Sequence, residues 1–191
     1  MTAEVVSATD ADVPRLSRVL SAAFANDSVC DWLFDGMQDR HNPKFFAAFL
    51  AAALRAGRVE QTADGTGVAV WFDATALLSA FADTELDEAL EKAVGPCLPR
   101  WKAFDVATIA AHTSDPHWYL AFLGVIPAHW GRGHGGELLR HAASWQAGAA
   151  AYLEAPSRRH VGFYGARGWE RGEAIVVPNG PVLYAMHRPA L

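Results

Sequence analysis

Four glycines, at positions 131, 133, 135 and 136, separate an apolar segment from an amphipathic one. Residues 117–125 read HWYLAFLGV and predict a buried strand, whereas 137–147 carries apolar residues at helical spacing. Glycine permits unusual backbone dihedral angles and close approach to a ligand, and the free N–H groups and dipole of a following helix attract anions. The pattern predicts a site for an anionic group, with a pyrophosphate as the best fit. The glycines are equally compatible with a tight turn that binds nothing.

Other phosphate-binding and metal-binding patterns do not fit. The dinucleotide fingerprint GxGxxG needs a different spacing and a surrounding βαβ unit, although Glu154 lies near the distance at which that fingerprint has an acidic residue. A Walker loop needs Gly-Lys-Ser/Thr, which does not occur here. The histidines lack HExxH spacing, and neither Cys30 nor Cys97 belongs to a CxxC pair. We therefore predict no metal.

The residues around the turn resemble a motif of the GNAT acetyltransferase superfamily. After a strand that ends in Gly-Val-x-Pro, that motif reads Gln/Arg-x-x-Gly-x-Gly/Ala. Here residues 124–127 read Gly-Val-Ile-Pro, and residues 130–135 read Trp-Gly-Arg-Gly-His-Gly. The match includes both motif glycines and departs from the motif at Trp130, where Gln or Arg is usual.

A second stretch resembles the other cofactor motif of the superfamily, in which a strand precedes a helix of the pattern Asn-x-x-Phe-Tyr-x-x-x-Gly-Phe. Residues 152–155 correspond to the strand and 159–169 to the helix. His160 stands in place of Asn, and Trp169 in place of Phe. The likeness is therefore specific over residues 118–170 and looser before them.

The resemblance implies one GNAT-like domain of the α/β (α+β) class over residues 1–191. Its sheet is expected to be mixed and mostly antiparallel, with about six to seven strands splayed in the middle and helices flanking it. Residues 118–170 are expected to form the acetyl-CoA-binding core.

The resemblance also implies where acetyl-CoA binds. The N–H groups of residues 133–137 would bind the pyrophosphate, and Arg132 would add charge. The backbone at Leu123 and Val125 would bind the pantetheine arm as a strand binds a peptide. The implied cofactor-binding residues are Leu123, Val125, Arg132, Gly133, His134, Gly135, Gly136, Glu137, His160 and Tyr164.

Two residues are implied in catalysis. Tyr164 occupies the position of the general acid in many superfamily members, and a phenol of pKa about 10 can protonate a thiolate. Without the motif, Tyr164 would be a packed aromatic residue. Glu154 is our first candidate for the base that deprotonates the amine, and an orienting role is equally compatible with it. His160 and His117 are weaker candidates.

The acceptor site is expected in segments 26–42 and 75–113. Aromatic rings with a few acids suit a cationic ligand that has apolar parts. For Trp71, a place in the core is the better prediction. The acceptor residues that we predict are Asp27, Trp32, Phe34, Trp71 and Glu154.

The acceptor is expected to be a primary amine of a small molecule. Segments 67–71 and 178–188 are similar to those of actinobacterial antibiotic N-acetyltransferases of the puromycin type, which suggests an amine antibiotic. Two alternatives remain open: a protein or peptide N-terminal acetyltransferase, and a non-catalytic acyl-CoA-binding regulatory module.

The elements that must position these residues follow from periodicity. Helices are predicted over 13–24, 45–54, 75–94, 137–147 and 159–166, and 102–112 is ambiguous. Strands are predicted near Val5 and over 58–62, 67–72, 117–125, 152–154, 175–177 and 182–187. This order indicates a mixed sheet covered by helices.

Composition narrows the class further. The net charge is −5 and no long basic run occurs, which argues against a nucleic-acid binder. The longest apolar stretch, 45–54, is too short to span a bilayer, and the first residues do not resemble a signal peptide. We expect a cytoplasmic protein without a membrane or nucleic-acid partner, and a homodimer is compatible with the sequence.

Overall fold

The protein is represented by a computed structural model that describes residues 3–37, 42–74 and 84–191. In these residues seven strands form one sheet in the order β1-β2-β3-β4-β5-β7-β6. All neighbours are antiparallel except β4 and β5, so the sheet is mixed and mostly antiparallel, as predicted. The strands are β1 (Val5–Ser7), β2 (Gly57–Thr62), β3 (Gly67–Asp73), β4 (Trp118–Val125), β5 (Ala151–Ala155), β6 (Glu170–Val176) and β7 (Val182–Arg188).

The sheet is splayed between β4 and β5. The two strands have 8 and 5 residues. Their register pairs only Trp118 with Ala151 and Tyr119 with Tyr152, at the start of each strand. Because parallel strands end at the same edge, the gap between them opens toward their carboxyl ends.

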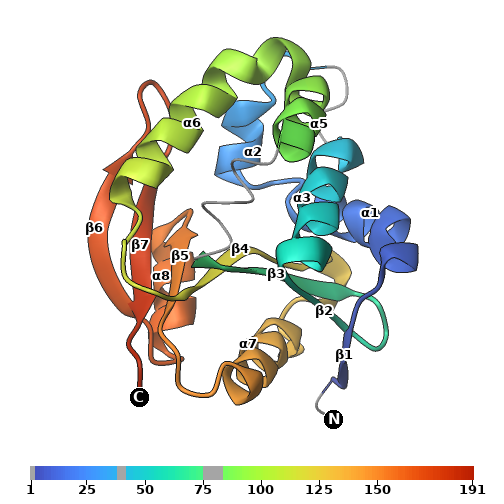
Figure 1. Cartoon of the computed structure of the whole chain (residues 1–191), viewed down its shortest axis with the longest axis vertical. Coiled ribbons are helices and arrows are strands. Elements are labelled where there is room, and N and C mark those ends of the chain that lie inside the picture. Colours follow the sequence, from blue (N-terminus) through green and yellow to red (C-terminus); the bar gives the residue numbers. More distant parts are fainter. Residues whose placement is uncertain (1–2, 38–41, 75–83) are drawn as a thin grey trace.

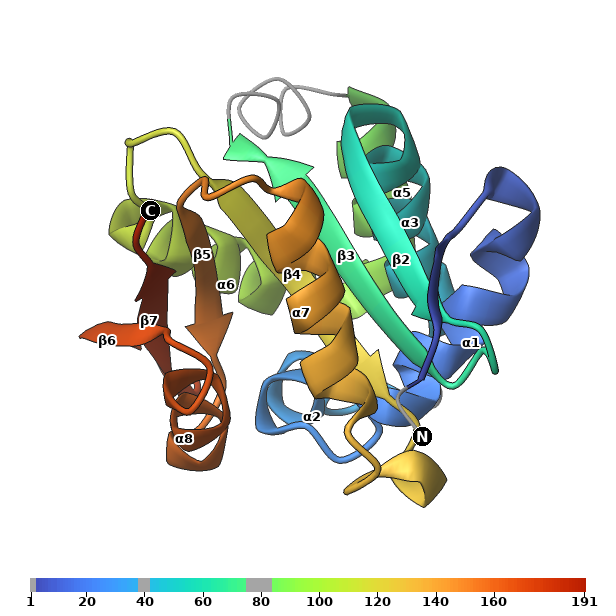
Figure 2. The ribbon, with the colours of Figure 1, turned by 90° about the horizontal axis from the view of Figure 1, so that it is seen from below.

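Helices cover both faces of the sheet (Figure 1). One face carries α1 (Val13–Ala23), α3 (Pro43–Ala56) and α5 (Thr84–Val94), and α7 (His134–Trp145) lies on the other. Figure 2 shows α7 along β3 and β4, with α8 beyond the end of β5. The remaining helices are α2 (Ser28–Leu33), α6 (Leu98–Ala111) and α8 (Arg158–Gly165), with 3-10 turns at Asp10–Asp12, Gly95–Cys97 and Pro127–His129.

The apolar stripe of α3 explains how the first face is covered. Phe45, Phe46 and Phe49 are buried and pack with their ring edges on Phe122 of β4. Such rings recur every three or four residues, so they form one face of a helix. Aromatic pairs of this kind add to the stability that apolar burial provides. The stripe thus fixes β4 from the side opposite α7.

Trp71 belongs to the core on the α7 face. Its side chain is fully buried with Leu120 and Leu138, and its ring lies edge-on to Trp145 at 6.1 Å. Successive strand residues point to opposite faces. The expectation that Trp71 contacts the acceptor is therefore wrong, and the alternative of a core residue holds.

Two elements differ from the sequence prediction. Residues 98–111 form α6, where periodicity was ambiguous because the exposed Val106 and Ile109 interrupt any polar face. Strand β6 begins at Glu170 rather than near 175, since it is a largely exposed edge strand with an irregular register.

The first part of the predicted helix 75–94 and residues 38–41 of the predicted acceptor segment lie outside the described residues. Within the described chain, no helix is long and apolar enough to cross a bilayer.

Candidate active site

A cleft of about 550 Å³ lies where β4 and β5 diverge. Its walls come from the α1–α2 connection, the glycine turn, the start of α7, and α8. It therefore connects the predicted anion-binding turn with the predicted chemical groups. The predicted site residues that line it are Asp27, Leu123, Val125, Gly133, His134, Gly135, Gly136, Glu154, His160 and Tyr164.

The glycine turn presents free backbone donors to this cleft. Gly133 precedes α7 with φ of 88°, a left-handed conformation that glycine adopts without strain. The first N–H groups of a helix have no partner within it. Here these belong to His134, Gly135 and Gly136, and they line the cleft. The turn thus has the donor arrangement that a pyrophosphate requires.

Tyr164 faces the same cleft from α8. The residue is only 7% exposed, and its ring packs on Phe163 and Trp169. Burial raises the pKa of Tyr164 above its ordinary value, and the nearby Arg167 opposes this only in part. The phenol therefore stays protonated at neutral pH and is able to donate a proton.

Glu154 reaches the cleft from β5. Its side chain is 6% exposed, and its Oε2 accepts a hydrogen bond of 2.9 Å from the hydroxyl of Tyr119. Its Oε1 lies 3.7 Å from Nδ1 of His112 and has no hydrogen-bond partner among the described residues. Oε1 is therefore a buried acceptor that still lacks a donor.

Comparison with known proteins identifies the family. The family described as "Acetyltransferase (GNAT) family" matches residues 27–169. The chain belongs to the GNAT acetyltransferase family. It is accordingly an acetyl-CoA-dependent acetyltransferase that acts on amines.

Solved structures of this fold extend over the whole chain. A Corynebacterium glutamicum structure described as histone acetyltransferase HPA2 and related acetyltransferase is 27% identical, with a TM-score of 0.70, and the match covers 100% of this chain and 98% of that one. A Drosophila melanogaster polyamine N-acetyltransferase matches at 13% identity and TM-score 0.57 over 98% and 100%. Arabidopsis thaliana Naa50 with the bisubstrate analogue CoA-Ac-MVNAL matches at 15% and 0.55 over 98% of each chain.

The residues of the cleft fit acetyl-CoA. A Cβ added to Gly133 would meet no atom within 4 Å, so the turn is open where a phosphate would lie. A Cβ on Gly135 would lie 3.3 Å from the ring of Phe163, which shows how closely α7 approaches α8. The free N–H groups of the GNAT turn lie beside this approach. These features match an elongated ligand with a pyrophosphate.

Glu137 cannot bind the pyrophosphate through its backbone. Its N–H already donates to the carbonyl of Gly133 at 3.0 Å, which is the first bond of the helix. Its carboxylate pairs with Arg140 at 2.7 Å. The predicted set of N–H donors was therefore one residue too long, because sequence alone did not locate the first helical residue.

Arg132 is exposed and does not line the cleft, whereas Arg159 and Arg167 do. The guanidinium of Arg159 lies 5.9 Å from the ring of Trp130, and that of Arg167 lies 3.9 Å from the ring of Phe163. Both arginines flank the Phe-Tyr pair of the second motif. Their position on either side of that pair was the signal that sequence reasoning did not use.

Three of the predicted acceptor residues lie outside the cleft. Trp71 is in the core, as described above, and Phe34 is 1% exposed and packs on Phe45. Trp32 donates from Nε1 to the carbonyl of Asn179 at 2.7 Å, which ties α2 to the turn between β6 and β7. Trp32 thus supports the wall of the site without facing it.

Asp27 and His160 do line the cleft, the first from the N-cap of α2 and the second from α8. Asp27 caps α2 by accepting from the N–H groups of Val29 and Cys30, while burial raises the pKa of its carboxyl. His160 lies 2.8 Å from the hydroxyl of Ser157 through Nδ1, and burial lowers the pKa of its imidazole. Both residues are therefore placed to contact a ligand.

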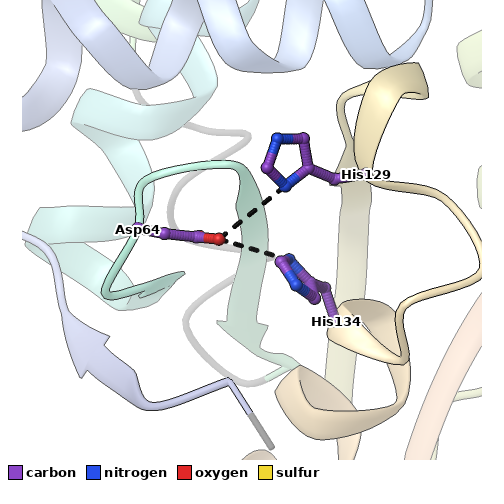
Figure 3. Close-up of side chains that lie close together, drawn as sticks. All are labelled: Asp64, His129 and His134. Carbon is purple, nitrogen blue, oxygen red and sulfur yellow. Dashed lines mark ion pairs between the residues drawn. The ribbon is translucent and has the colours of Figure 1, made fainter. Parts of the chain in front are cut away.

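The side chain of His134 points away from the cleft, toward the β2–β3 turn. Figure 3 shows it beside Asp64 and His129, and the ligand-type atoms of these residues lie within 4.8 Å of one another. Burial opposes ionisation of Asp64, but hydrogen bonds from Thr62 and Thr66 outweigh it and lower the pKa of Asp64 to about 2.

Hydrogen bonds to Thr66 join two members of this group, Asp64 and His134. The hydroxyl of Thr66 donates to Oδ1 of Asp64 at 2.8 Å, so Nδ1 of His134, 3.0 Å away, must donate to that hydroxyl. We interpret the group as an anchor that holds the start of α7 to the β2–β3 turn.

Proposed function

We propose that this GNAT acetyltransferase moves an acetyl group from acetyl-CoA to a primary amine of a small molecule, by direct transfer within one cleft. The observation that carries the proposal is that Glu154 and Tyr164 line the same cleft as the free N–H groups of the glycine turn. A base, an acid and an anion site thus share one cavity. Aligned reactants account for about 7–11 kcal/mol of rate enhancement in such reactions.

The residues of the chain have separate tasks. Acetyl-CoA supplies an activated thioester when it is bound. The N–H groups of Gly135 and Gly136 hold its pyrophosphate, and Arg159 adds positive charge at the wall. Tyr164 gives its phenolic proton to the leaving sulfur, and Glu154 accepts a proton from the substrate ammonium.

The walls of the cleft favour a small acceptor over a peptide. The bond from Trp32 to Asn179 joins α2 to the β6–β7 turn. Phe104 of α6 packs against the buried cluster of Ile175 and Leu183, as Trp32 of α2 does, which places α6 over the same side of the sheet. A peptide needs an open groove for its backbone, whereas α2 and α6 occupy this side of the sheet. Asp27 supplies a carboxyl group for a cationic amine.

The test begins with calorimetric titration of acetyl-CoA, with NADH as the control ligand. Release of thiol is then measured with four acceptor types: polyamines, arylalkylamines, amine antibiotics such as puromycin, and N-terminal peptides. Turnover with a small amine and none with peptides would support the proposal. Turnover with peptides alone would favour a protein acetyltransferase, and binding without any thiol release would favour a regulatory module.

A further inference from the structure

A buried chain of titratable groups lies behind Glu154. His112 caps the end of α6, and its Nε2 lies 2.9 Å from Nε2 of His117. Nδ1 of His117 lies 2.6 Å from the backbone carbonyl of Asp115. On the other side, Nδ1 of His112 faces Oε1 of Glu154 at 3.7 Å. This series of groups therefore leads from the cleft through two imidazole rings to a backbone carbonyl.

The carbonyl of Asp115 determines the tautomer of His117. A carbonyl oxygen only accepts, so Nδ1 of His117 carries a hydrogen and donates it. Burial lowers the pKa of His117, which leaves the ring neutral with a single N–H. Its Nε2 is then an acceptor, and Nε2 of His112 must be the donor of the 2.9 Å bond.

This assignment leaves a proton missing between His112 and Glu154. A neutral His112 that donates from Nε2 has a bare lone pair on Nδ1. The atom opposite, Oε1 of Glu154, is buried and has no hydrogen-bond partner in the described part of the chain. The other oxygen of Glu154 is already paired with Tyr119. Two acceptors thus face each other, and each would gain a partner from one added proton.

We infer that Glu154 and His112 take up one proton jointly and that this pair is the acceptor for the proton of the substrate ammonium. The inference rests on the proposed function, because it requires an amine beside Glu154. One N–H bond of the ammonium breaks, its electron pair stays on nitrogen, and the proton moves to Oε1 of Glu154. The proton is then shared with Nδ1 of His112.

The surroundings stabilise a positive charge on His112 and leave its side chain partly exposed to water. The ring follows the carboxyl end of α6, whose dipole stabilises a cation. Its side chain is 17% exposed, compared with 6% for Glu154, so His112 releases the proton to water. The titratable groups packed around the pair are Asp105 on α6, His117 before β4, Tyr119 on β4, Tyr152 on β5 and His187 on β7.

The two tyrosines do not compete for the proton. Burial raises the pKa of Tyr119, and Glu154 adds to the effect. The pKa of Tyr152 is raised by the same two causes in the same order. Both phenols therefore remain protonated at neutral pH. Tyr119 donates to Oε2 of Glu154, and the ring of Tyr152 forms a wall beside the imidazole of His112.

The tautomers are tested first, in the free protein and without any amine. Nitrogen-15 spectra of the histidine side chains at pH 8, assigned with His112→Gln and His117→Gln, should show His117 protonated on Nδ1 and His112 on Nε2. A neutral His117 protonated on Nε2, or a His112 protonated on Nδ1, would overturn the inference. This readout does not depend on catalysis.

Kinetics of His112→Gln form the second test, with the amine that gives the fastest thiol release. We expect kcat to fall about tenfold or more, since general bases contribute about 10²–10⁴-fold. The KM for acetyl-CoA should not change, and the acidic limb of the pH profile of kcat/KM should move. His141→Gln is the matched control, because His141 pairs with Glu60 away from the cleft, and it should keep wild-type kinetics.

The two possible failures can be told apart. An active wild type with an unchanged kcat and pH profile in His112→Gln would overturn the inference alone. A wild type that binds acetyl-CoA but acetylates no amine would overturn the proposed function, and the acceptor role of the pair with it.

Discussion

The indole Nε1 of Trp130 donates a hydrogen bond of 2.6 Å to the backbone carbonyl of Val125. This bond joins the residue at which the sequence departs from the GNAT motif to the last residue of β4. The indole is half exposed, lines the cleft and carries Arg159 against its ring. Trp130 therefore fixes the turn relative to the strand, where family members usually have a polar side chain.

Replacing Trp130 with Phe should weaken binding of acetyl-CoA about fivefold, because one hydrogen bond contributes about 1 kcal/mol while the aromatic wall is kept. Calorimetric titration measures the change in Kd. Trp32→Phe is the matched control, since it removes an indole bond of 2.7 Å that lies outside the cleft. An equal loss in both variants, or none in Trp130→Phe, would contradict this role.

Replacing Arg159 with Gln should weaken acetyl-CoA binding about tenfold, because hydrogen bonds to charged groups contribute about 1.5–3 kcal/mol. Arg132→Gln should leave Kd nearly unchanged, since Arg132 is exposed and does not line the cleft. The difference between the variants should shrink at high salt as screening increases. A larger loss in Arg132→Gln would return that residue to the cofactor site.

Replacing Gly133 with Ala should lower the free energy of unfolding by about 1–2 kcal/mol, because its φ is 88° and left-handed residues with a Cβ are strained. No atom lies within 4 Å of the added Cβ, so backbone strain is the cause. Gly162→Ala, within α8 and equally uncrowded, should instead be neutral or stabilising. Urea unfolding compares them, and equal destabilisation would contradict the explanation.

Local patterns predicted the parts of the fold in which packing and periodicity agree. The phenylalanines of α3, which bury one face of that helix, and the continuous apolar run of β3, which is buried on both faces of the sheet, are examples. Periodicity did not identify α6, where Val106 and Ile109 remain exposed while Thr108 is buried. Because exposed apolar residues and a buried polar residue are mixed along α6, this helix has no single apolar face that periodicity could detect.

The site shows the same division. Gly135 and Tyr164, which line the cleft, could be predicted from the motifs because the spacing along the chain encodes the turn and the helix. His112 was not found, because only the end of α6 and the pairing of β4 with β5 bring it to Glu154. Residues that meet through a sheet register are distant in sequence and carry no local pattern.

Acid should destabilise the protein through His117. Burial lowers its pKa in the folded state, so protonation favours the unfolded chain. The contribution is complete above the ordinary value of about 6.5 and is lost as pH falls below it. The free energy of unfolding should therefore decrease between pH 7.5 and 5.5 in the wild type, and less in His117→Gln. Equal losses in both proteins would assign the acid sensitivity to other groups.

Replacing Tyr164 with Phe should lower kcat about a hundredfold or more, because the proton for the leaving sulfur is removed. Burial raises the pKa of Tyr164, so the hydroxyl is protonated throughout the neutral range and the loss should not depend on pH there. The ring contacts with Phe163 and Trp169 are kept, and acetyl-CoA should bind with an unchanged Kd. Tyr184→Phe, which removes a hydroxyl outside the cleft, is the control. Unchanged thiol release by Tyr164→Phe would show that another group protonates the sulfur.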